Sequence, residues 1–156
     1  MQPSENLQPD RDPRLSGAPD ESCSPTPSSK TENPIATVLI VEDDFLIGMQ
    51  TEDALVDAGL SVVGIATTAE EAVLLARQHR PSLVLMDIRL AGRRDGIDAA
   101  AQLFRELGIR CLFATAHDDV HTRARAEQLQ PLGWLAKPYT MPSLVALVRE
   151  AVARIA

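Results

Sequence analysis

The sequence predicts an α/β domain in which five parallel strands form one sheet and five helices cover both of its faces. The first observation is the continuously apolar run Leu83–Met86, which is typical of a strand buried on both faces of a parallel sheet. The second is Thr37–Val41, which is β-branched and apolar and predicts another central strand. The third is that segments with helical apolar spacing lie between such runs, an alternation that gives parallel strands joined by right-handed crossovers.

The first half of the predicted domain begins at Ile35 and contains three strands and two helices. In chain order these elements span residues 37–41, 45–58, 61–66, 69–79 and 83–87, of which the second and fourth are helices. Asp44 stands where a helix N-cap is expected, and Gly59 closes the first helix as a C-terminal stop. The second helix is preceded by Thr68, which begins a Thr-Ala-Glu-Glu sequence with the form of a capping box.

The second half of the predicted domain contains two strands and three helices. The strands are expected at 110–114 and 132–136, and the helices at 96–107, 118–130 and 141–155. Asp95–Gly96 opens the third helix, and Gly108 stops it. Asp118 or Asp119 caps the fourth helix, which is more polar than the others, and Thr140 caps the last.

Residues 1–34 differ in composition from the rest of the chain. They are rich in Pro, Ser, Asp and Glu, so they lack the apolar surface whose burial would offset the entropy of ordering them. The sequence therefore predicts a disordered tail at 1–34 and one domain at 35–156, a length normal for a single domain.

The overall composition argues against several classes of function. Of the 156 residues, 45% are hydrophobic and 3% aromatic, which favours an aliphatic core. The net charge of −7 argues against general binding to nucleic acid or to an anionic membrane surface. No run reaches membrane-spanning length, and the first residues lack the order of a signal peptide. We interpret Cys23 and Cys111 as reduced thiols of a cytoplasmic protein, and Cys111 as a small buried hydrophobe.

Polar side chains stand at the ends of four predicted strands, where open α/β sheets bind ligands. Glu42 and Asp43 follow the first strand, Asp87 ends the third, Thr115 ends the fourth and Lys137 follows the fifth. In the flavodoxin-like strand order 2-1-3-4-5 the first and third strands are neighbours, so three carboxylates would meet. Close carboxylates repel unless a cation neutralises them, and we expect Mg²⁺, a hard ion that takes oxygen ligands.

These residue types suit phosphoryl transfer to a carboxylate. Asp87 can act as a nucleophile and accept a phosphoryl group as an acyl phosphate. Mg²⁺ on one side and the Lys137 ammonium on the other would spread the charge of the transferring group, and the Thr115 hydroxyl would donate to a phosphate oxygen. Lys137 is the only lysine after Lys30. A requirement for a compact ammonium explains this count, and so does a codon bias towards arginine.

Five motifs together resemble the receiver domain of two-component response regulators. In the order and spacing of that family they are Val38–Asp44, Leu83–Asp87, Asp95–Gly96, Phe113–Ala116 and Lys137–Pro138. The resemblance covers the chain from about Thr37 to its end. It implies that Asp87 is the phosphoacceptor. It further implies that Asp43, Asp87 and the backbone carbonyl of Arg89 bind Mg²⁺, while Glu42 acts through a metal-bound water.

The resemblance also implies roles for residues around the phosphoryl group. Thr115 and Lys137 would hold the phosphoryl oxygens. Trp134 occupies the position of the family's switch ring, which is usually Tyr or Phe and pairs with the threonine. Arg89 and His117, two residues after the phosphoacceptor and the threonine, stand where the family tunes the lifetime of the phosphoryl group.

By the same resemblance, the phosphoryl donor is a phosphohistidine on a sensor histidine kinase or a histidine phosphotransfer protein. The residues after Lys137 suffice for one helix, so we expect a stand-alone receiver that signals through phosphorylation-dependent contact with a downstream protein. The expected contact face comprises the fourth helix, fifth strand and fifth helix, near Trp134, Arg123 and Arg125. No enzymatic turnover is expected beyond self-catalysed phosphoryl transfer and autodephosphorylation.

Four alternative functions remain open at this point. A phosphate sink would drain a kinase and have no downstream target. A pseudo-receiver would bind partners without phosphorylation, and its expected mark is the loss of a site residue, whereas all are present. A flavin-binding flavodoxin-like protein needs a phosphate loop after the first strand, where Glu42–Asp44 has the wrong charge. A phosphatase that uses Asp87 as its nucleophile usually needs an acid two residues later, where Arg89 stands.

Overall fold

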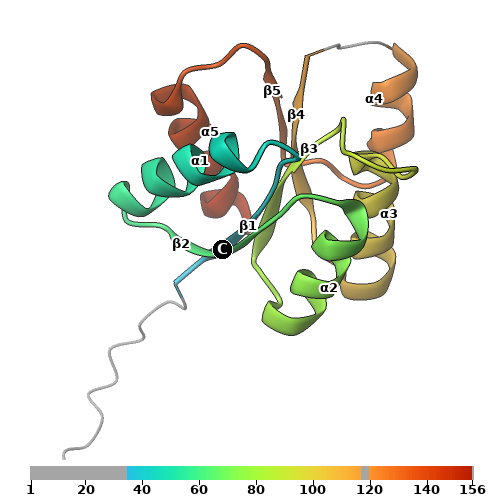
Figure 1. Ribbon diagram of the computed structural model, residues 1–156, viewed down its shortest axis with the longest axis horizontal. Helices are drawn as coiled ribbons and strands as arrows, with labels where there is room; N and C mark the ends of the chain where they lie inside the picture. Colours follow the sequence, from blue (N-terminus) through green and yellow to red (C-terminus); the bar gives the residue numbers. More distant parts are fainter. Residues whose placement is uncertain (1–34, 117–119, 156) are drawn as a thin grey trace, which may run out of the picture. The chain divides into compact units, whose positions relative to one another are not determined.

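The computed structural model describes residues 35–116 and 120–155, which form one five-stranded parallel sheet with helices on both faces (Figure 1). The strand order is β2-β1-β3-β4-β5, as predicted. In chain order the elements are β1 (Thr37–Val41), α1 (Phe45–Asp57), β2 (Ser61–Ala66), α2 (Ala69–His79), β3 (Leu83–Asp87), α3 (Gly96–Leu107), β4 (Cys111–Thr115), α4 (Val120–Glu127), β5 (Gly133–Ala136) and α5 (Met141–Ile155). The predicted tail at 1–34, His117 and the candidate caps Asp118 and Asp119 lie outside the described residues.

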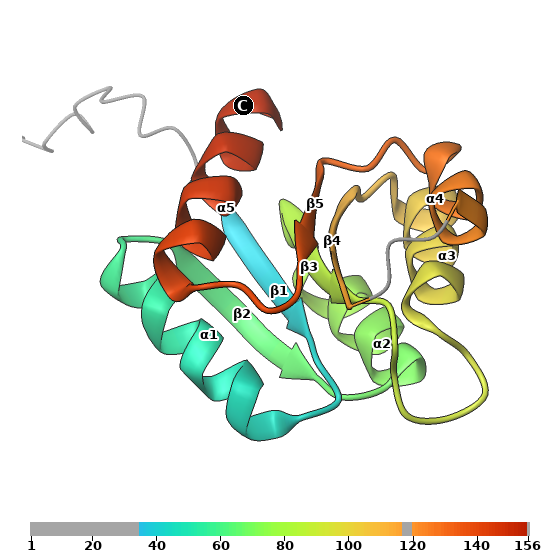
Figure 2. The ribbon, with the colours of Figure 1, turned by 90° about the horizontal axis from the view of Figure 1, so that it is seen from above.

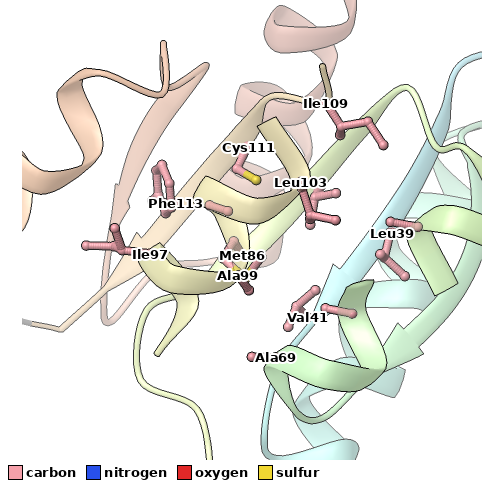
Figure 3. Close-up of a cluster of buried hydrophobic side chains, with 14 of the residues drawn as sticks. Leu39, Val41, Ala69, Met86, Ile97, Ala99, Leu103, Ile109, Cys111 and Phe113 are labelled. Carbon is pink, nitrogen blue, oxygen red and sulfur yellow. The ribbon is translucent and has the colours of Figure 1, made fainter. Parts of the chain in front are cut away.

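The helices form two layers, one on each face of the sheet. α1 and α5 cover one face, and α2, α3 and α4 cover the other (Figure 2). Because successive side chains of a strand point to opposite faces, β1 contributes to two apolar cores. Ile40 packs in the core with Leu144 of α5, and Val41 packs in the core with Leu103 of α3 and Phe113 of β4 (Figure 3). Within the described part of the chain, every helix is too short or too polar to cross a bilayer.

The register of the strands aligns the ends that carry polar residues. β1 and β3 are parallel neighbours in which Val41 pairs with Met86. The residues that follow this pair are Glu42 and Asp87, so the two carboxylates lie side by side at the carboxyl edge of the sheet. The parallel pairing continues through β4 and β5, which brings Thr115 to the same edge.

The predicted helix starts are confirmed at α1 and half confirmed at α2. Asp44 caps α1, since its Oδ1 accepts a hydrogen bond from the Leu46 N–H at 3.0 Å. Thr68 caps α2 and accepts from the Glu71 N–H at 3.1 Å. The reciprocal bond of the predicted capping box is made one residue earlier, because the Glu71 carboxylate accepts from the N–H and hydroxyl of Thr67, each at 3.1 Å.

α4 is shorter than predicted and ends at Glu127 rather than near Gln130. The chain leaves the helix through a turn in which the Leu129 N–H donates to the Ala126 carbonyl at 2.9 Å. Gln130 then takes a left-handed conformation with φ of 52°, which a continuing helix does not allow. Ala126 is the buried residue of α4, so little apolar packing extends the helix further.

Two strands also begin one residue later than predicted, β4 at Cys111 and β5 at Gly133. The preceding residues still bond to neighbouring strands, because the Arg110 carbonyl accepts from the Val84 N–H at 3.3 Å and the Leu132 N–H donates to the Cys111 carbonyl at 2.8 Å. These differences lie within the normal spread of strand boundaries.

The start of α3 approaches the end of β3 so closely that only glycine fits at position 96, the first residue of the helix. The Gly96 N–H donates to the Ile88 carbonyl at 2.7 Å. A Cβ at position 96 would collide with the backbone carbonyl of Asp87 and would lie 2.9 Å from the Ile88 Cα. Gly96 therefore sets the distance between α3 and the backbone of Asp87.

We expect Gly96→Ala to lower the free energy of unfolding by about 1–3 kcal/mol, because the added methyl forces two backbone segments apart. Gly64→Ala is the matched control, since its Cβ would make an ordinary contact at 3.5 Å with the Leu75 side chain. Urea unfolding of both variants measures the difference. Equal midpoints for the two variants would show that the α3 start has more room than the contacts indicate.

Candidate functional site

The candidate site lies at the carboxyl edge of the sheet, where the structure brings together five residues singled out from the sequence. Glu42, Asp87 and Thr115 are buried there, with 5%, 5% and 7% of their surfaces exposed. Asp43 is exposed, and Lys137 is half-buried. Burial of two acids is unusual unless a partner or a cation neutralises them, so the arrangement itself indicates a site.

The three acids form a cluster with the spacing of metal ligands. One carboxylate oxygen from each of Glu42, Asp43 and Asp87 lies within 4.8 Å of the others. Backbone groups orient two of these acids: the Asp44 N–H donates to Glu42 Oε1 at 3.3 Å, and the Arg89 N–H donates to Asp87 Oδ1 at 3.2 Å. An all-oxygen cluster with one exposed member suits Mg²⁺, which binds one or two carboxylates and keeps several waters.

Lys137 supplies the positive charge of the site. Its Nζ donates a hydrogen bond to Asp87 Oδ2 at 3.0 Å and lies 3.6 Å from Glu42 Oε2. The Lys137 N–H also donates to the Thr115 carbonyl at 2.9 Å, which holds the lysine beside the end of β4. Burial opposes the charge of Lys137, but the hydrogen bond to Asp87 and the attraction of both carboxylates outweigh it and raise the pKa of the lysine. One ammonium thus faces two buried acids.

The cluster carries more negative charge than Lys137 neutralises. Burial is the largest influence on Glu42, followed by its hydrogen bond with Asp43 and repulsion from Asp87, and together they raise its pKa to about 8. The attraction of Lys137 acts in the opposite direction and does not cancel them. The residues present therefore fit a divalent cation, because such an ion would supply the missing charge and would accept oxygen ligands.

Trp134 lies in the core between the sheet and α4, not within the acidic cluster. It is half-buried and stacks on Phe113 of β4, with ring centroids 5.1 Å apart and an angle of 27° between the planes. The Arg123 guanidinium of α4 lies over the Trp134 ring, 4.8 Å from its centroid, in a cation–π contact. Phe113 is two residues before Thr115 in β4, so the stacked Trp134 ring is connected to the site through this strand.

The structure gives partial information on the two residues expected to tune the phosphoryl lifetime. Arg89 is exposed, and its backbone N–H donates to the Asp87 carboxylate. His117 lies outside the described residues. Cys111 is buried, as expected, and burial raises the pKa of its thiol to about 12, so it is an unreactive part of the core.

Sequence reasoning missed two features of the structure, one next to the site and one at the start of α3. The first is a hollow of about 420 Å³ next to Lys137, which is lined by Ile47, Ala116, Lys137, Pro138, Tyr139 and Met141. Residues from α1, the end of β4 and the region from the β5–α5 connection to the start of α5 line it, and no local sequence pattern predicts that these segments lie together. The second is an ion pair between Arg125 of α4 and Asp95, the N-cap of α3, which joins residues thirty positions apart.

Comparison with known proteins identifies relatives of the whole described domain. Transcriptional regulatory protein PdtaR of Mycobacterium tuberculosis is 37% identical over 117 residues, which are 75% of this chain and 57% of that protein. Phyllosphere-induced regulator PhyR of Methylorubrum extorquens is 34% identical over 116 residues, which are 74% of this chain and 43% of that protein. The chain thus spans about half the length of these curated relatives.

Solved structures agree with this relationship. The signal receiver domain of a modulated diguanylate cyclase from Desulfovibrio desulfuricans G20 has a TM-score of 0.70 and 36% identity, covering 78% of this chain and 96% of that one. A CheY-like response regulator receiver domain protein from Methanospirillum hungatei has a TM-score of 0.71 at 21% identity with the same coverage, and that likeness concerns the fold alone.

The family comparison gives the same result directly. Residues 38–149 match the model of the response regulator receiver domain, from β1 to within α5. Since this match covers well over half of the sequence, the chain belongs to the family of response regulator receiver domains.

Proposed function

We propose that this protein is a stand-alone, cytoplasmic phosphoryl-accepting receiver of a two-component phosphorelay, with Asp87 as the phosphoacceptor and Mg²⁺ as its cofactor. The observation that carries the proposal is the hydrogen bond of Lys137 Nζ to Asp87 Oδ2 at 3.0 Å within a cluster of three carboxylates. A carboxylate placed between an ammonium and a cation site is oriented and electrostatically prepared to receive an anionic group.

The residues of the site have separate roles in the proposed transfer. An Asp87 oxygen attacks the phosphorus atom of a phosphohistidine, the O–P bond forms, and the P–N bond breaks with its electron pair passing to the imidazole. The bound Mg²⁺ would supply charge neutralisation on the phosphoryl oxygens. Asp43, Asp87 and the Arg89 carbonyl would hold the ion directly, and Glu42 would hold it through a water.

The remaining residues act on the phosphoryl group once it is on Asp87. Lys137 exchanges its bond to the carboxylate for one to a phosphoryl oxygen, and the Thr115 hydroxyl donates to another. Arg89, which is exposed and two residues after Asp87, and His117 are proposed to influence the lifetime of the acyl phosphate. Hydrolysis of the acyl phosphate returns the protein to its starting state, so no substrate is turned over in the usual enzymatic sense.

The proposed partners lie on both sides of this reaction. A sensor histidine kinase or a histidine phosphotransfer protein would supply the phosphoryl group. A downstream protein would bind the face made by α4, β5 and α5, where Arg123 and Arg125 are exposed and Trp134 is half-buried. The regulators PdtaR and PhyR support a role in signalling, although this chain spans about half of each. Neither nucleic acid nor a membrane is a proposed partner.

We expect Mg²⁺ to stabilise the protein, because an ion that binds the native cluster and not the unfolded chain shifts the folding equilibrium. A saturating excess should raise the melting temperature by roughly 5 °C. Asp43→Asn should abolish most of this shift. The neighbouring Asp44→Asn is the matched control, because asparagine still caps α1 and the shift should persist. A wild-type protein insensitive to Mg²⁺ would contradict the cofactor assignment.

We expect one phosphoryl group to be added by a small-molecule phosphoryl donor, seen as a gain of about 80 Da in intact mass. The gain should require Mg²⁺, disappear with EDTA and be absent from Asp87→Asn. Asp53→Asn, which replaces an exposed acid of α1, should behave as wild type. Absence of the gain from a folded wild-type protein would instead favour a pseudo-receiver that acts without phosphorylation.

We expect the fluorescence of Trp134, the one tryptophan in the sequence, to change when Asp87 is phosphorylated. Its ring stacks on Phe113, two residues before Thr115, so a rearrangement of the threonine would alter the surroundings of the indole. Emission spectra before and after phosphorylation measure this change, with Asp87→Asn as the control. Unchanged emission from a protein whose mass has increased would remove Trp134 from the switch.

A further inference from the structure

The start of α3 is held by a cluster of charged contacts. Asp95 and Asp98 form a full capping box: the Asp98 N–H donates to Asp95 Oδ1 at 2.9 Å, and the Asp95 N–H donates to Asp98 Oδ2 at 3.1 Å. Two carboxylates are thereby placed close together at one helix end. Their mutual repulsion would weaken this arrangement unless a cation lay beside them.

Arg125 of α4 supplies that cation. Its guanidinium donates to both Asp95 oxygens, at 2.8 and 3.2 Å, and to Asp98 Oδ1 at 3.1 Å. Burial opposes the ionisation of Asp95, but the hydrogen bonds from Arg125 and from the Asp98 backbone lower its pKa overall. The planar guanidinium suits this two-oxygen contact better than an ammonium does.

The residue after Asp95 touches the backbone of the proposed phosphoacceptor. Gly96 donates its N–H to the Ile88 carbonyl at 2.7 Å, and it lies so close to the Asp87 carbonyl that no side chain fits between them. The cap of α3 therefore closes the β3–α3 loop, which includes Arg89. A shift of Asp95 would be transmitted through Gly96 to the backbone on both sides of Asp87.

The same helix that carries Arg125 also touches Trp134. Arg123 lies over the indole ring at 4.8 Å, so α4 is attached to the sheet at one contact and to the α3 start at another. One of these contacts leads to β4 and Thr115, and the other leads to the loop after Asp87. A displacement of α4 would therefore disturb both.

We propose that Arg125 is a positioning residue for Asp87, which couples the location of α4 to the geometry of the metal and phosphoryl site through Asp95 and Gly96. This inference rests on the proposed function and adds its regulation. Because coupling between two sites is reciprocal, a protein that binds α4 and draws Arg125 away from Asp95 lowers the affinity of the site for Mg²⁺. Conversely, occupation of the site holds α4 in place.

The test compares Arg125→Ala with Arg77→Ala. Arg77 of α2 forms an exposed ion pair at 2.7 Å with Glu106, near the opposite end of α3. Removing Arg77 therefore also deletes an arginine contact to α3, but one far along the helix from Asp95. We measure hydrogen exchange at the amides of Gly96 and Asp98, Mg²⁺ affinity and the melting temperature. Exchange in the metal-free protein needs neither the ion nor a phosphoryl donor.

We expect Arg125→Ala to speed exchange at both amides and to weaken Mg²⁺ binding by about two- to five-fold, the range appropriate for a half-exposed charged contact. Arg125→Lys should restore part of both effects, since it keeps the charge and loses the bidentate geometry. Arg77→Ala should match wild type in exchange at these amides and in Mg²⁺ affinity, whatever its melting temperature.

The inference is overturned if Arg125→Ala leaves exchange at Gly96 and Asp98 unchanged, or if Arg77→Ala has the same effects on exchange and affinity. The second result would mean a general weakening of α3. A failure of the proposed function appears elsewhere, as a wild-type protein that takes no phosphoryl group. In that case the exchange data still decide whether Arg125 positions the loop after Asp87.

Discussion

Repulsion among the carboxylates at the carboxyl edge of the sheet is the constraint on which the rest of the site depends. Because β1 and β3 are neighbours in register, Glu42 and Asp87 lie side by side, and Asp43 joins them. Two of these acids are buried, so solvent does not screen their charges effectively. Lys137 offsets part of the repulsion, but burial of Glu42, its hydrogen bond with Asp43 and repulsion from Asp87 together still raise the pKa of Glu42. The demand for a cation is thus a property of the strand order itself.

The surrounding fold fixes the backbone that carries the Asp87 carboxylate. β3 is buried on both faces, and its register with β1 sets how far along the sheet edge Asp87 lies. The contact of Gly96 then fixes the backbone after Asp87. The ladder and the glycine contact act on the backbone, whereas the Arg89 N–H and the Lys137 ammonium hold the two carboxylate oxygens of Asp87. A rigid frame around the carboxylate is what the proposed role of Asp87 would require.

The strands and the five edge residues could be predicted from the sequence because their signals are local, whereas the predicted strand order rests on the flavodoxin-like arrangement. Apolar runs such as Leu83–Met86 mark buried strands, and a polar residue directly after each run must lie at the edge. The contacts of Arg125 and Trp134 could not be predicted, because they join elements whose distance depends on side-chain packing. The end of α4 was predicted too late, since its polar sequence carries no stop before the left-handed Gln130. Likewise, sequence spacing alone did not decide whether the Glu71 carboxylate accepts from the N–H of Thr68 or from that of Thr67, and the structure has the Thr67 bond.

The separation of Asp87 and Lys137 along the chain has a consequence for the synthesis of the protein on the ribosome. Fifty residues divide the two partners of this ion pair, and the lysine follows β5, the last strand of the sheet in chain order. A growing chain that has not yet added β5 therefore carries its acids without their ammonium, and such late, non-local contacts form slowly. Until Lys137 has been added, the three acids therefore repel one another without the attraction that this lysine supplies to Asp87 and Glu42 in the folded domain.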